Sequence, residues 1–429
     1  MRFAIHTLGC KVNRCDADAF SAELVRLGFK ACGFSEAADI YIVNTCTVTH
    51  TSDKKSMQFI NKARKNNPDG IVAVCGCMVR KDTPTNHPAD ILFDARKPLD
   101  FIQKLEKFTG VPVKELPCSS GHLSKPPVSD YGHHHSIKSK KRTRSFLKIQ
   151  DGCRQFCSFC IVPYVRGDAV SRKKTVLLEE VKNLIEGGAK EIVLTGINMS
   201  AYHCEADFAT LLREILETAN KTRIRLSSLE PLAVNEDFLE VVRCFDNLCP
   251  HFHLPLQSGS DRILGMMNRR YSAREYERTV EKIRVQKPDA AITTDVIVGF
   301  PGEDESDFLS TYSLALAVGF SDMHVFEYSK REGTKAATFP MQIERGVKKQ
   351  RSKKLRDLAK KMKSSYLEKQ LHRTLQVLFE GESNKGIFHG FGKEYVRVFA
   401  KSGEPLVNMV KNVKIMEAVD DSLIGEIQY

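Results

Sequence analysis

The sequence predicts an α/β protein in three parts: an N-terminal parallel α/β sheet, a central partial (β/α)6 barrel and a small C-terminal β-barrel. Three observations support this prediction. Apolar strands alternate with amphipathic helices over residues 1–108, the alternation resumes at Ser145, and residues 374–429 change to short strands separated by glycine turns. With 429 residues, 42% of them hydrophobic, the chain is long enough for two or three cores.

The first part, residues 1–112, is predicted to form a parallel sheet covered by helices. We expect strands near residues 2–8, 39–44, 70–75 and 90–94, and helices near 13–28, 53–66 and 98–108. Cys10, Cys46 and Cys77 each come after the end of a predicted strand. Because carboxyl ends of parallel strands meet at one edge of a sheet, these three cysteines are expected to be neighbours in space.

Residues 113–138 are predicted to be a linker, since they are rich in Pro, Ser, Gly and His and lack a helix or strand period. Residues 139–369 then repeat strand and helix. We expect strands near 145–150, 191–195, 223–228, 251–256, 292–298 and 322–328. Six β/α units predict an incomplete barrel, with its chemistry at the carboxyl ends of the strands.

Residues 370–429 are predicted to form the small β-barrel. Short strands are expected at 375–379, 395–399 and 412–415, separated by glycine turns. An alternative is that this part only packs against the barrel and binds nothing.

The spacing of Cys153, Cys157 and Cys160 predicts an iron–sulfur site. Three thiolates on one short loop can hold three irons of a [4Fe–4S] cube and leave the fourth iron open to a ligand that is not protein. Structural zinc is the alternative, but such sites use paired C-x2-C ligands and close all four positions, and no fourth Cys or His follows nearby.

This spacing resembles the signature of radical S-adenosylmethionine (SAM) enzymes. Three further segments resemble the cysteine motifs of the methylthiotransferases within that group: Thr7–Asn13, Asn44–Thr49 and Cys75–Met78. Thr7–Asn13 and Ser52–Ser56 are most similar to the branch that acts on N6-threonylcarbamoyladenosine at position 37 of tRNA. The resemblance extends over nearly the whole chain.

The resemblance implies two [4Fe–4S] clusters, with SAM as the second cofactor. Cys153, Cys157 and Cys160 would hold the cluster that cleaves SAM reductively, and Cys10, Cys46 and Cys77 the cluster that supplies sulfur. Cys75 and Cys77 share one face in a strand alternation, and the family pattern favours Cys77. The implied reaction places a methylthio group on C2 of the adenine, a carbon whose hydrogen needs radical chemistry to be removed.

The resemblance also implies residues that contact SAM or the substrate. Gly187, Gly188 and Glu191 resemble a segment that contacts the methionine amino group, although a glycine pair also ends helices. Ser228, Glu230 and Gln257 are expected to hydrogen-bond the SAM ribose or polar substrate groups, and Ile297 and Val298 to pack on adenine. For each polar residue, capping the barrel rim is the alternative. Val170 stands where the family commonly has Arg, which puts one SAM or phosphate contact in doubt.

Charge favours a nucleic-acid partner. The net charge is +12, and residues 344–373 hold twelve Lys and Arg against three Asp and Glu. We expect Lys353, Lys354 and Lys360 to bind RNA, with a solvated basic helix face as the alternative. The C-terminal part is similar in size and position to the TRAM domain, an RNA-binding appendage of the family. The expected substrate is the tRNA anticodon stem-loop.

Other functions are compatible with the same sequence features. Relatives in the family act on isopentenyladenosine at position 37 or on an aspartate of a ribosomal protein, but a basic protein substrate would be repelled by the positive segment. A non-catalytic, zinc-containing RNA-binding protein is the alternative from another class. No apolar stretch approaches membrane-spanning length, so we expect a cytoplasmic monomer, with an electron donor and a sulfur donor that the sequence does not identify.

Overall fold

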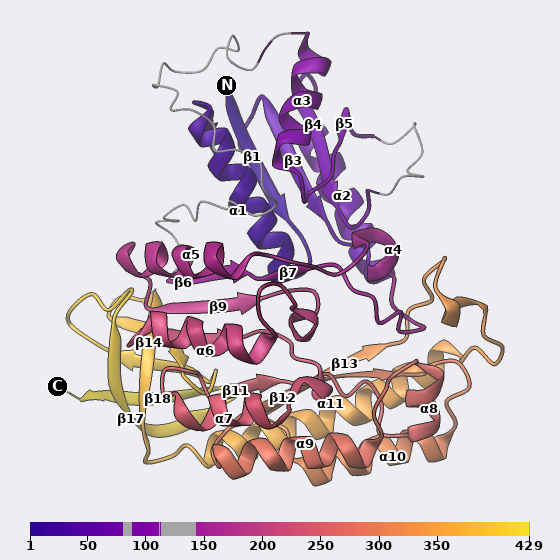
Figure 1. Cartoon of the computed structure of the whole chain (residues 1–429), viewed down its shortest axis with the longest axis vertical. Helices are drawn as coiled ribbons and strands as arrows, with labels where there is room; N and C mark the ends of the chain where they lie inside the picture. The colour runs from indigo at the N-terminus through magenta and orange to yellow at the C-terminus, as the bar shows by residue number, and fades with distance from the viewer. Residues whose placement is uncertain (80–87, 111, 113–142, 429) are drawn as a thin grey trace.

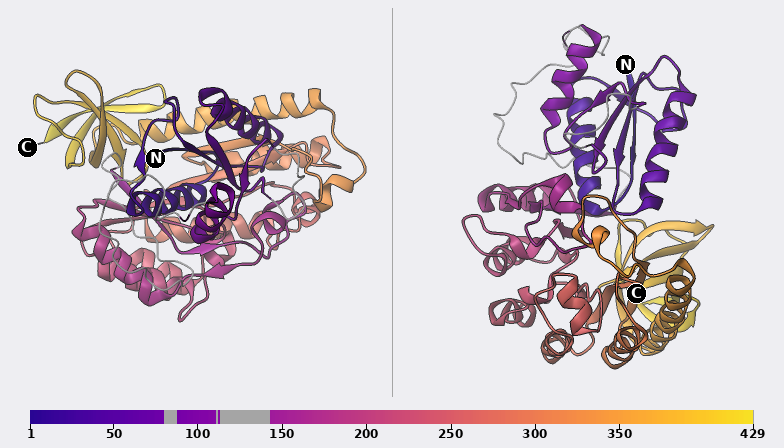
Figure 2. Two further views of the ribbon diagram at one scale, coloured as in Figure 1. Left: turned by 90° about the horizontal axis from the view of Figure 1, so that it is seen from above. Right: turned by 90° about the vertical axis from the view of Figure 1, so that its right-hand side faces the viewer.

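The computed structural model describes residues 1–79, 88–110, 112 and 143–428. The predicted linker at 113–138 lies outside the described residues. The N-terminal sheet stands on one end of the central barrel, and the C-terminal barrel packs beside it at the other end (Figures 1 and 2). The predicted fold class is confirmed. Among the described helices, none has both the length and the apolar character required to cross a bilayer.

The N-terminal part is a five-stranded parallel sheet in the order β2-β1-β3-β4-β5. Its strands are β1 (Arg2–Thr7), β2 (Lys30–Ala31), β3 (Ile40–Thr45), β4 (Ile71–Gly76) and β5 (Ile91–Leu92), and its helices are α1 (Lys11–Arg26), α2 (His50–Asn66) and α3 (Pro98–Thr109). Every residue of the central strand β3 is buried, as expected for a parallel strand covered on both faces.

The central part is a partial barrel of six parallel strands. They are β6 (Arg144–Lys148), β9 (Glu191–Thr195), β10 (Arg223–Leu226), β11 (His251–His253), β12 (Ala291–Val298) and β13 (Asp322–Glu327). The half β6-β9-β10 joins the half β11-β12-β13 through isolated bridges between Ile224 and Leu248 and between Ser228 and His253. A small hairpin of β7 (Gln150–Asp151) and β8 (Val170–Ser171) follows the first strand.

Helices cover the outer surface of this barrel and bury its core. They are α4 (Val162–Arg166), α5 (Lys174–Glu186), α6 (Phe208–Ala219), α7 (Glu236–Cys244), α8 (Asp261–Met266), α9 (Ala273–Gln286), α10 (Glu305–Val318) and α11 (Arg345–Glu368), with short 3-10 turns η2 (Met199–Ala201), η3 (Pro231–Ala233) and η4 (Lys335–Thr338). Capping boxes at Ser272 and Asp304 satisfy the first amides of α9 and α10. The largest buried apolar cluster joins strands β6 to β13 to these helices.

The C-terminal part is a closed five-stranded barrel in the order β14-β15-β16-β18-β17. Its strands are β14 (Thr374–Asn384), β15 (Ile387–Gly392), β16 (Arg397–Lys401), β17 (Val410–Val419) and β18 (Ser422–Gln428). The sequence predicted β14, β16 and β17 and missed β15 and β18. Closure leaves no free strand edge.

A buried ion pair attaches the C-terminal barrel to the central barrel. Arg225, 1% exposed, lies 2.6 Å and 3.0 Å from the two carboxylate oxygens of Glu191. The same guanidinium donates to the carbonyls of Gly392 and Lys393 at 3.1 Å and 2.9 Å. Glu191 and Gly392 are buried and Lys393 is partly buried, so Arg225 holds two parts of the molecule together in a largely dry contact.

Replacing Arg225 by Met is expected to lower the free energy of unfolding by about 3–5 kcal/mol, because it leaves the Glu191 carboxylate buried without its main partner. The control is Lys282→Ala, which removes an exposed pair with Glu236 and is expected to cost less than about 1 kcal/mol. Urea unfolding measures both. Equal effects would show that the buried pair contributes no more than a surface pair.

Candidate functional site

Cys10, Cys46 and Cys77 lie together at the carboxyl edge of the N-terminal sheet. Cys10 caps α1 directly after β1, and Cys46 and Cys77 follow β3 and β4. These three strands are neighbours in the sheet. The backbone of Gly9 passes so close to Cys46 that a Cβ on Gly9 would lie 3.0 Å from the Cys46 sulfur. The edge therefore gathers three thiols that are far apart in sequence.

Two asparagines fix the chain at this edge. The Asn13 side chain donates to the carbonyls of Leu8 and Thr45 at 2.8 Å and 2.9 Å, and Asn44 donates to the Asn13 carbonyl at 2.7 Å. Asn13 thus joins the ends of β1 and β3 and holds the Cys10 and Cys46 turns in register.

Cys75 and Cys77 have different surroundings. Cys75 is fully buried within β4, in an apolar cluster with Phe3 and Phe20. Gly76 has a φ of +87°, so the chain turns there and Cys77 leaves the strand. Burial raises the pKa of the Cys77 thiol to about 11, with Cys10 and Cys46 near enough to contribute and Arg166 acting in the opposite direction. The structure groups Cys77 with Cys10 and Cys46.

The second trio occupies the loop after β7, at the carboxyl end of the central barrel. Gly152 precedes Cys153 with a φ of +72°, and a Cβ on it would lie 1.9 Å from the Asp168 carbonyl oxygen. The Cys153 amide donates to the Gly167 carbonyl at 3.1 Å, and the Cys160 amide to the Cys157 carbonyl at 2.9 Å. These contacts hold the loop in one compact conformation.

Polar side chains surround this trio. Arg269 approaches the Cys157 sulfur at 3.4 Å and also pairs with Glu230. Asn198, just beyond the carboxyl end of β9, approaches the Cys153 sulfur at 3.9 Å. Burial raises the pKa of the Cys157 thiol, and Arg269 opposes that effect by favouring the thiolate. The sequence analysis did not predict Arg269 or Asn198. Asn198 could have been found, because it follows the carboxyl end of a predicted strand, where ligands gather in parallel sheets.

The spacing of the sulfurs separates two kinds of metal site. Four thiolates around one zinc ion lie about 3.8 Å apart, as Zn–S bonds of about 2.3 Å in a tetrahedron require. Within the parts of the chain that the structure describes, neither trio has all its sulfurs within 4.8 Å of one another. Neither trio therefore has the close grouping of sulfurs that a single zinc ion requires.

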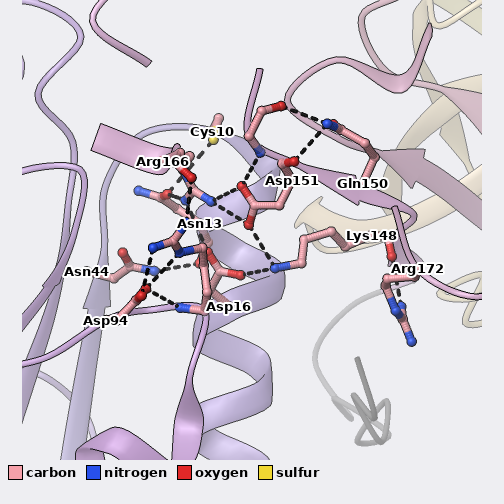
Figure 3. A network of polar contacts seen from close by, with 12 residues as sticks. Cys10, Asn13, Asp16, Asn44, Asp94, Lys148, Gln150, Asp151, Arg166 and Arg172 are labelled. Carbon is pink, nitrogen blue, oxygen red and sulfur yellow. Dashed lines mark hydrogen bonds and ion pairs between the residues drawn. The ribbon is translucent and has the colours of Figure 1, made fainter. Parts of the chain in front are cut away.

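A buried ion network joins the two cysteine sites (Figure 3). Arg166 donates to both oxygens of Asp151 at 2.8 Å and 2.9 Å, and also to Asp16 at 3.1 Å and to Asn13. Lys148 pairs with Asp16 at 2.6 Å and with Asp151 at 3.2 Å. Two cations thus face two carboxylates, and all four residues are less than 8% exposed.

This network crosses between two parts of the molecule. Asp16 and Asn13 belong to α1 of the N-terminal part, whereas Asp151 lies two residues before Cys153 in the central barrel. Burial alone would raise the pKa of Asp151, but Lys148 and Arg166 offset this and hold it well below its usual range. The Asp151 carboxylate therefore stays ionised between the two cations.

A second contact between these parts involves Arg331, after β13. Its guanidinium reaches Asp53 at 2.6 Å and the Thr47 hydroxyl at 2.7 Å. Ser56, on the same helix as Asp53, exchanges hydrogen bonds with the backbone of Cys46 at 3.1 Å and 3.3 Å. The segment Ser52–Ser56 thus supports the Cys46 turn and the contact between the two parts.

The structure does not bring Gly187, Gly188 and Glu191 to the cysteines. Gly187 and Gly188 end α5, and Glu191 begins β9, whereas Cys153 lies beside Asn198 at the other end of that strand. Both carboxylate oxygens of Glu191 are bonded to Arg225. The expected contact with a methionine amino group is therefore corrected: a Gly-Gly pair before a strand marks its amino end, and ligands gather at the carboxyl end.

The other expected contacts divide between two groups. Glu230 lies beside Cys157 through Arg269. Ile297 packs on the same apolar cluster as Phe159 of the cysteine loop, but Val298 is 1% exposed in the main core. Adjacent strand residues point to opposite faces, so Ile297 and Val298 cannot pack on one ring, and the expectation is wrong for Val298, while that for Ile297 stays a prediction.

The remaining predicted residues lie at the barrel surface and on α11. Ser228 is exposed where β10 meets β11, and Gln257 is half-buried with its amide donating to the Asp295 carbonyl at 2.8 Å. Lys353, Lys354 and Lys360 are exposed on α11. The Lys354 ammonium lies 3.6 Å from Glu305 and over the Phe308 ring, so it already has partners in the protein.

Comparison with known proteins defines the class. Residues 147–315 match the Radical SAM superfamily, and residues 2–93 match the uncharacterized protein family UPF0004. The fold resembles a radical SAM methyltransferase, TsrM from Kitasatospora setae, solved with tryptophan substrate and a SAM analogue. The TM-score is 0.55 at 15% identity, covering 76% of this chain and 72% of that one. The fold is that of a radical SAM protein, and the matched residues 147–315 include Cys153, Cys157 and Cys160.

Relatives at higher identity define the family. A threonylcarbamoyladenosine tRNA methylthiotransferase of Bacillus subtilis (strain 168) is 35% identical, over 97% of this chain and 94% of the relative. A tRNA-2-methylthio-N(6)-dimethylallyladenosine synthase of Clostridium tetani (strain Massachusetts / E88) is also 35% identical, over 99% and 96%. The chain therefore belongs to the radical SAM methylthiotransferase family. Its cofactors are [4Fe–4S] clusters and SAM.

Replacing Gly152 by Ala is expected to lower the free energy of unfolding by well over the ~1–2 kcal/mol that a non-glycine residue costs in the left-handed conformation. The additional loss arises because the new Cβ would overlap the Asp168 carbonyl. The control is Gly319→Ala, which has a φ of +61° and open space around it. Urea unfolding and iron content after anaerobic reconstitution measure the outcome. If both variants lose the same stability and keep the same iron content, close packing at Gly152 does not matter.

Proposed function

We propose that this chain is a transferase that places a methylthio group on C2 of N6-threonylcarbamoyladenosine at position 37 of tRNA, using SAM and two [4Fe–4S] clusters. The observation that carries the proposal is the pairing of two cysteine trios, each at the carboxyl edge of its own parallel sheet and joined by the Arg166 network. A zinc-containing RNA-binding protein would need neither two open trios nor such a connection between them.

Cys153, Cys157 and Cys160 would hold one cluster, and Cys10, Cys46 and Cys77 the other. A [4Fe–4S] cluster held by Cys153, Cys157 and Cys160 would supply the electron that cleaves SAM. Around it, Arg269 and Asn198 donate toward sulfurs and stabilise thiolate charge. Ile297 offers an apolar surface beside the loop, and Glu230 fixes the direction of the Arg269 guanidinium.

Arg166 would serve the trio of Cys10, Cys46 and Cys77 in a similar way. Its guanidinium lies close enough to Cys77 and Cys10 for their charges to act on it, and it is held by two carboxylates, so it cannot turn away. A fixed cation beside thiolates stabilises the negative charge that a cluster carries. The electron donor and the sulfur donor are separate partners, and we expect the enzyme to act in the cytoplasm as a monomer.

The second candidate substrate is an adenosine with a dimethylallyl group, as in the name of the Clostridium tetani relative. Mass spectrometry of tRNA nucleosides from cells with and without this protein separates the two. Loss of the methylthio form of N6-threonylcarbamoyladenosine supports the proposal. Loss of only the methylthio dimethylallyl nucleoside would assign the other substrate.

Two cysteine variants are expected to separate the roles of the trios. Cys157→Ala should abolish formation of 5′-deoxyadenosine from SAM, whereas Cys46→Ala should retain it and yield no methylthio nucleoside. Liquid chromatography with mass spectrometry measures both products. Cys244→Ala, which changes an exposed thiol on α7, is the control and should keep both. Methylthio product from Cys46→Ala would contradict the sulfur-supplying role of the trio at the N-terminal sheet.

We also propose that Lys353 and Lys360 bind the tRNA backbone. Replacing both by Gln is expected to weaken tRNA binding and to flatten its dependence on salt, by about 0.9 in the logarithmic slope for each phosphate that is no longer neutralised. Lys354→Gln is the matched control on the same helix, because that ammonium is paired with Glu305. Fluorescence anisotropy over a range of salt concentrations measures the slope. An unchanged slope in the double variant would leave α11 as a solvated face.

A further inference from the structure

Three titratable side chains, none of them a cysteine of either trio, meet on adjacent strands of the central barrel. They are His253 on β11, Asp295 on β12 and His324 on β13. Within the described parts of the chain, they form the only group of three or more Cys, His, Asp or Glu side chains whose donor atoms all lie within 4.8 Å. None of the three has a role in the proposed reaction as described above.

This cluster lies on the inner face of the barrel sheet. On β12, Val296 and Val298 enter the main core with the covering helices, so Asp295 and Ile297 point to the opposite face. On β13, Met323 and Val325 pack toward the helices, and His324 points away from them. The cluster therefore shares a face with Ile297 and lies two residues before it.

The cluster also lies beside the lateral gap of the barrel. The strand order is β6-β9-β10-β11-β12-β13, and in the described residues β6 pairs only with β9 and β13 only with β12. Strand β13 is therefore an open edge (Figure 1). The side chain of His324 is 59% exposed, compared with 27% for Asp295 and 12% for His253. Among the three, His324 has the side chain that is most accessible to a binding partner.

The hydrogen bonds give His324 a defined orientation. Its Nδ1 lies 3.0 Å from one oxygen of Asp295, and the other oxygen lies 3.2 Å from Nε2 of His253. His253 Nδ1 is 2.9 Å from the Thr293 hydroxyl, so both its ring nitrogens are engaged. Within the described contacts, His324 Nε2 is not used, which leaves one nitrogen directed away from Asp295.

The carboxylate also favours the charged form of this imidazole. The hydrogen bond with Asp295 raises the pKa of His324, partly opposed by burial. The charged ring donates Nδ1–H to Asp295 and carries a second N–H at Nε2. An exposed N–H on a cationic ring, held in place by a carboxylate, is suited to bind an anion with a charge-assisted hydrogen bond.

We propose that His324, held by Asp295 and His253, binds the carboxylate of the threonylcarbamoyl group and so selects the substrate. This inference rests on the proposed function. The threonylcarbamoyl group on N6 ends in a carboxylate, a dimethylallyl group has no polar atom, and an unmodified adenosine has no substituent there. C2 and C6 are separated by one ring nitrogen, so a residue that recognises the N6 substituent must lie to one side of the reacting carbon.

The same three side chains have the composition of a two-histidine, one-carboxylate metal site. Their hydrogen bonds favour an organic anion instead. Each Asp295 oxygen already lies within hydrogen-bond distance of a ring nitrogen, and His253 is engaged at both nitrogens. An incoming metal ion would have to break these bonds. An anion would bind at the unused Nε2 and break none.

The experiment compares binding of three anticodon stem-loops to the full-length, anaerobically reconstituted protein by fluorescence anisotropy. They carry adenosine, N6-threonylcarbamoyladenosine or its neutral methyl ester at position 37. We expect the stem-loop with N6-threonylcarbamoyladenosine to bind about tenfold more tightly than the one with adenosine, as one hydrogen bond to a charged group allows. The methyl ester should lose this preference, because it removes the charge and leaves the rest of the substituent.

Two substitutions at His324 test the residue itself. His324→Leu should remove the preference, and His324→Arg should retain it, because arginine also donates to a carboxylate. The control His203→Leu changes an exposed histidine outside the cluster and should keep the preference. The unfolding temperature of each variant checks folding, and a role limited to stability would not be rescued by arginine.

Four outcomes would overturn the inference. One is that the wild-type protein and His324→Leu prefer the stem-loop with N6-threonylcarbamoyladenosine over the one with adenosine to the same extent. Another is a stoichiometric zinc or manganese ion, detected by elemental analysis, that is absent from His324→Leu. Equal affinity of the wild-type protein for the first two stem-loops would overturn the role of His324 and leave the tRNA assignment in place. Failure to bind any anticodon stem-loop better than an unrelated RNA hairpin would overturn the proposed function as well.

Discussion

The arrangement of the whole site depends on the buried pairing of Arg166 and Lys148 with Asp16 and Asp151. Four ionised side chains in a space almost closed to water are costly unless every charge has its partner. Here each carboxylate faces both cations at 2.6–3.2 Å. Such a network adds little net stability compared with apolar packing, but it permits one arrangement only: a shift of α1 against the central barrel would leave a charge buried alone.

This constraint acts where the chemistry requires it. Asp151 lies next to Gly152 in the turn that leads to Cys153, and Asp16 and Asn13 lie in the first turns of the helix that Cys10 begins. Each cysteine trio is shaped by its own sheet edge, through Gly9 and Gly76 on one side and Gly152 on the other. The ion network then sets the position of one edge relative to the other. Local backbone turns thus define each trio, and long-range charge pairing defines the distance between them.

The sequence predicted the features that are local or periodic. Strand β9 was predicted with its observed bounds, and the carboxyl-end rule grouped the thiols of Cys10, Cys46 and Cys77. Prediction failed where a residue's role depends on a partner far away in the chain. Glu191 is explained mainly by Arg225, and Arg166 reaches Asp16, 150 residues earlier, as well as the nearer Asp151. Strands β15 and β18 were missed because their residues are of mixed polarity and their pairing depends on closure of the barrel.

Substrate choice is best explained by a few side chains on the edge strand β13 of the central barrel. Two relatives are named for different adenosine substituents, and each is 35% identical to this chain over nearly its whole length. The common scaffold therefore cannot distinguish the substituents. On β13, Met323 and Val325 pack into the core, whereas His324 and Phe326 are exposed toward the gap. Because a strand alternates its faces, the exposed pair can change without disturbing the packed pair. The cysteine edges and the ion network can therefore stay constant while the recognised substituent changes.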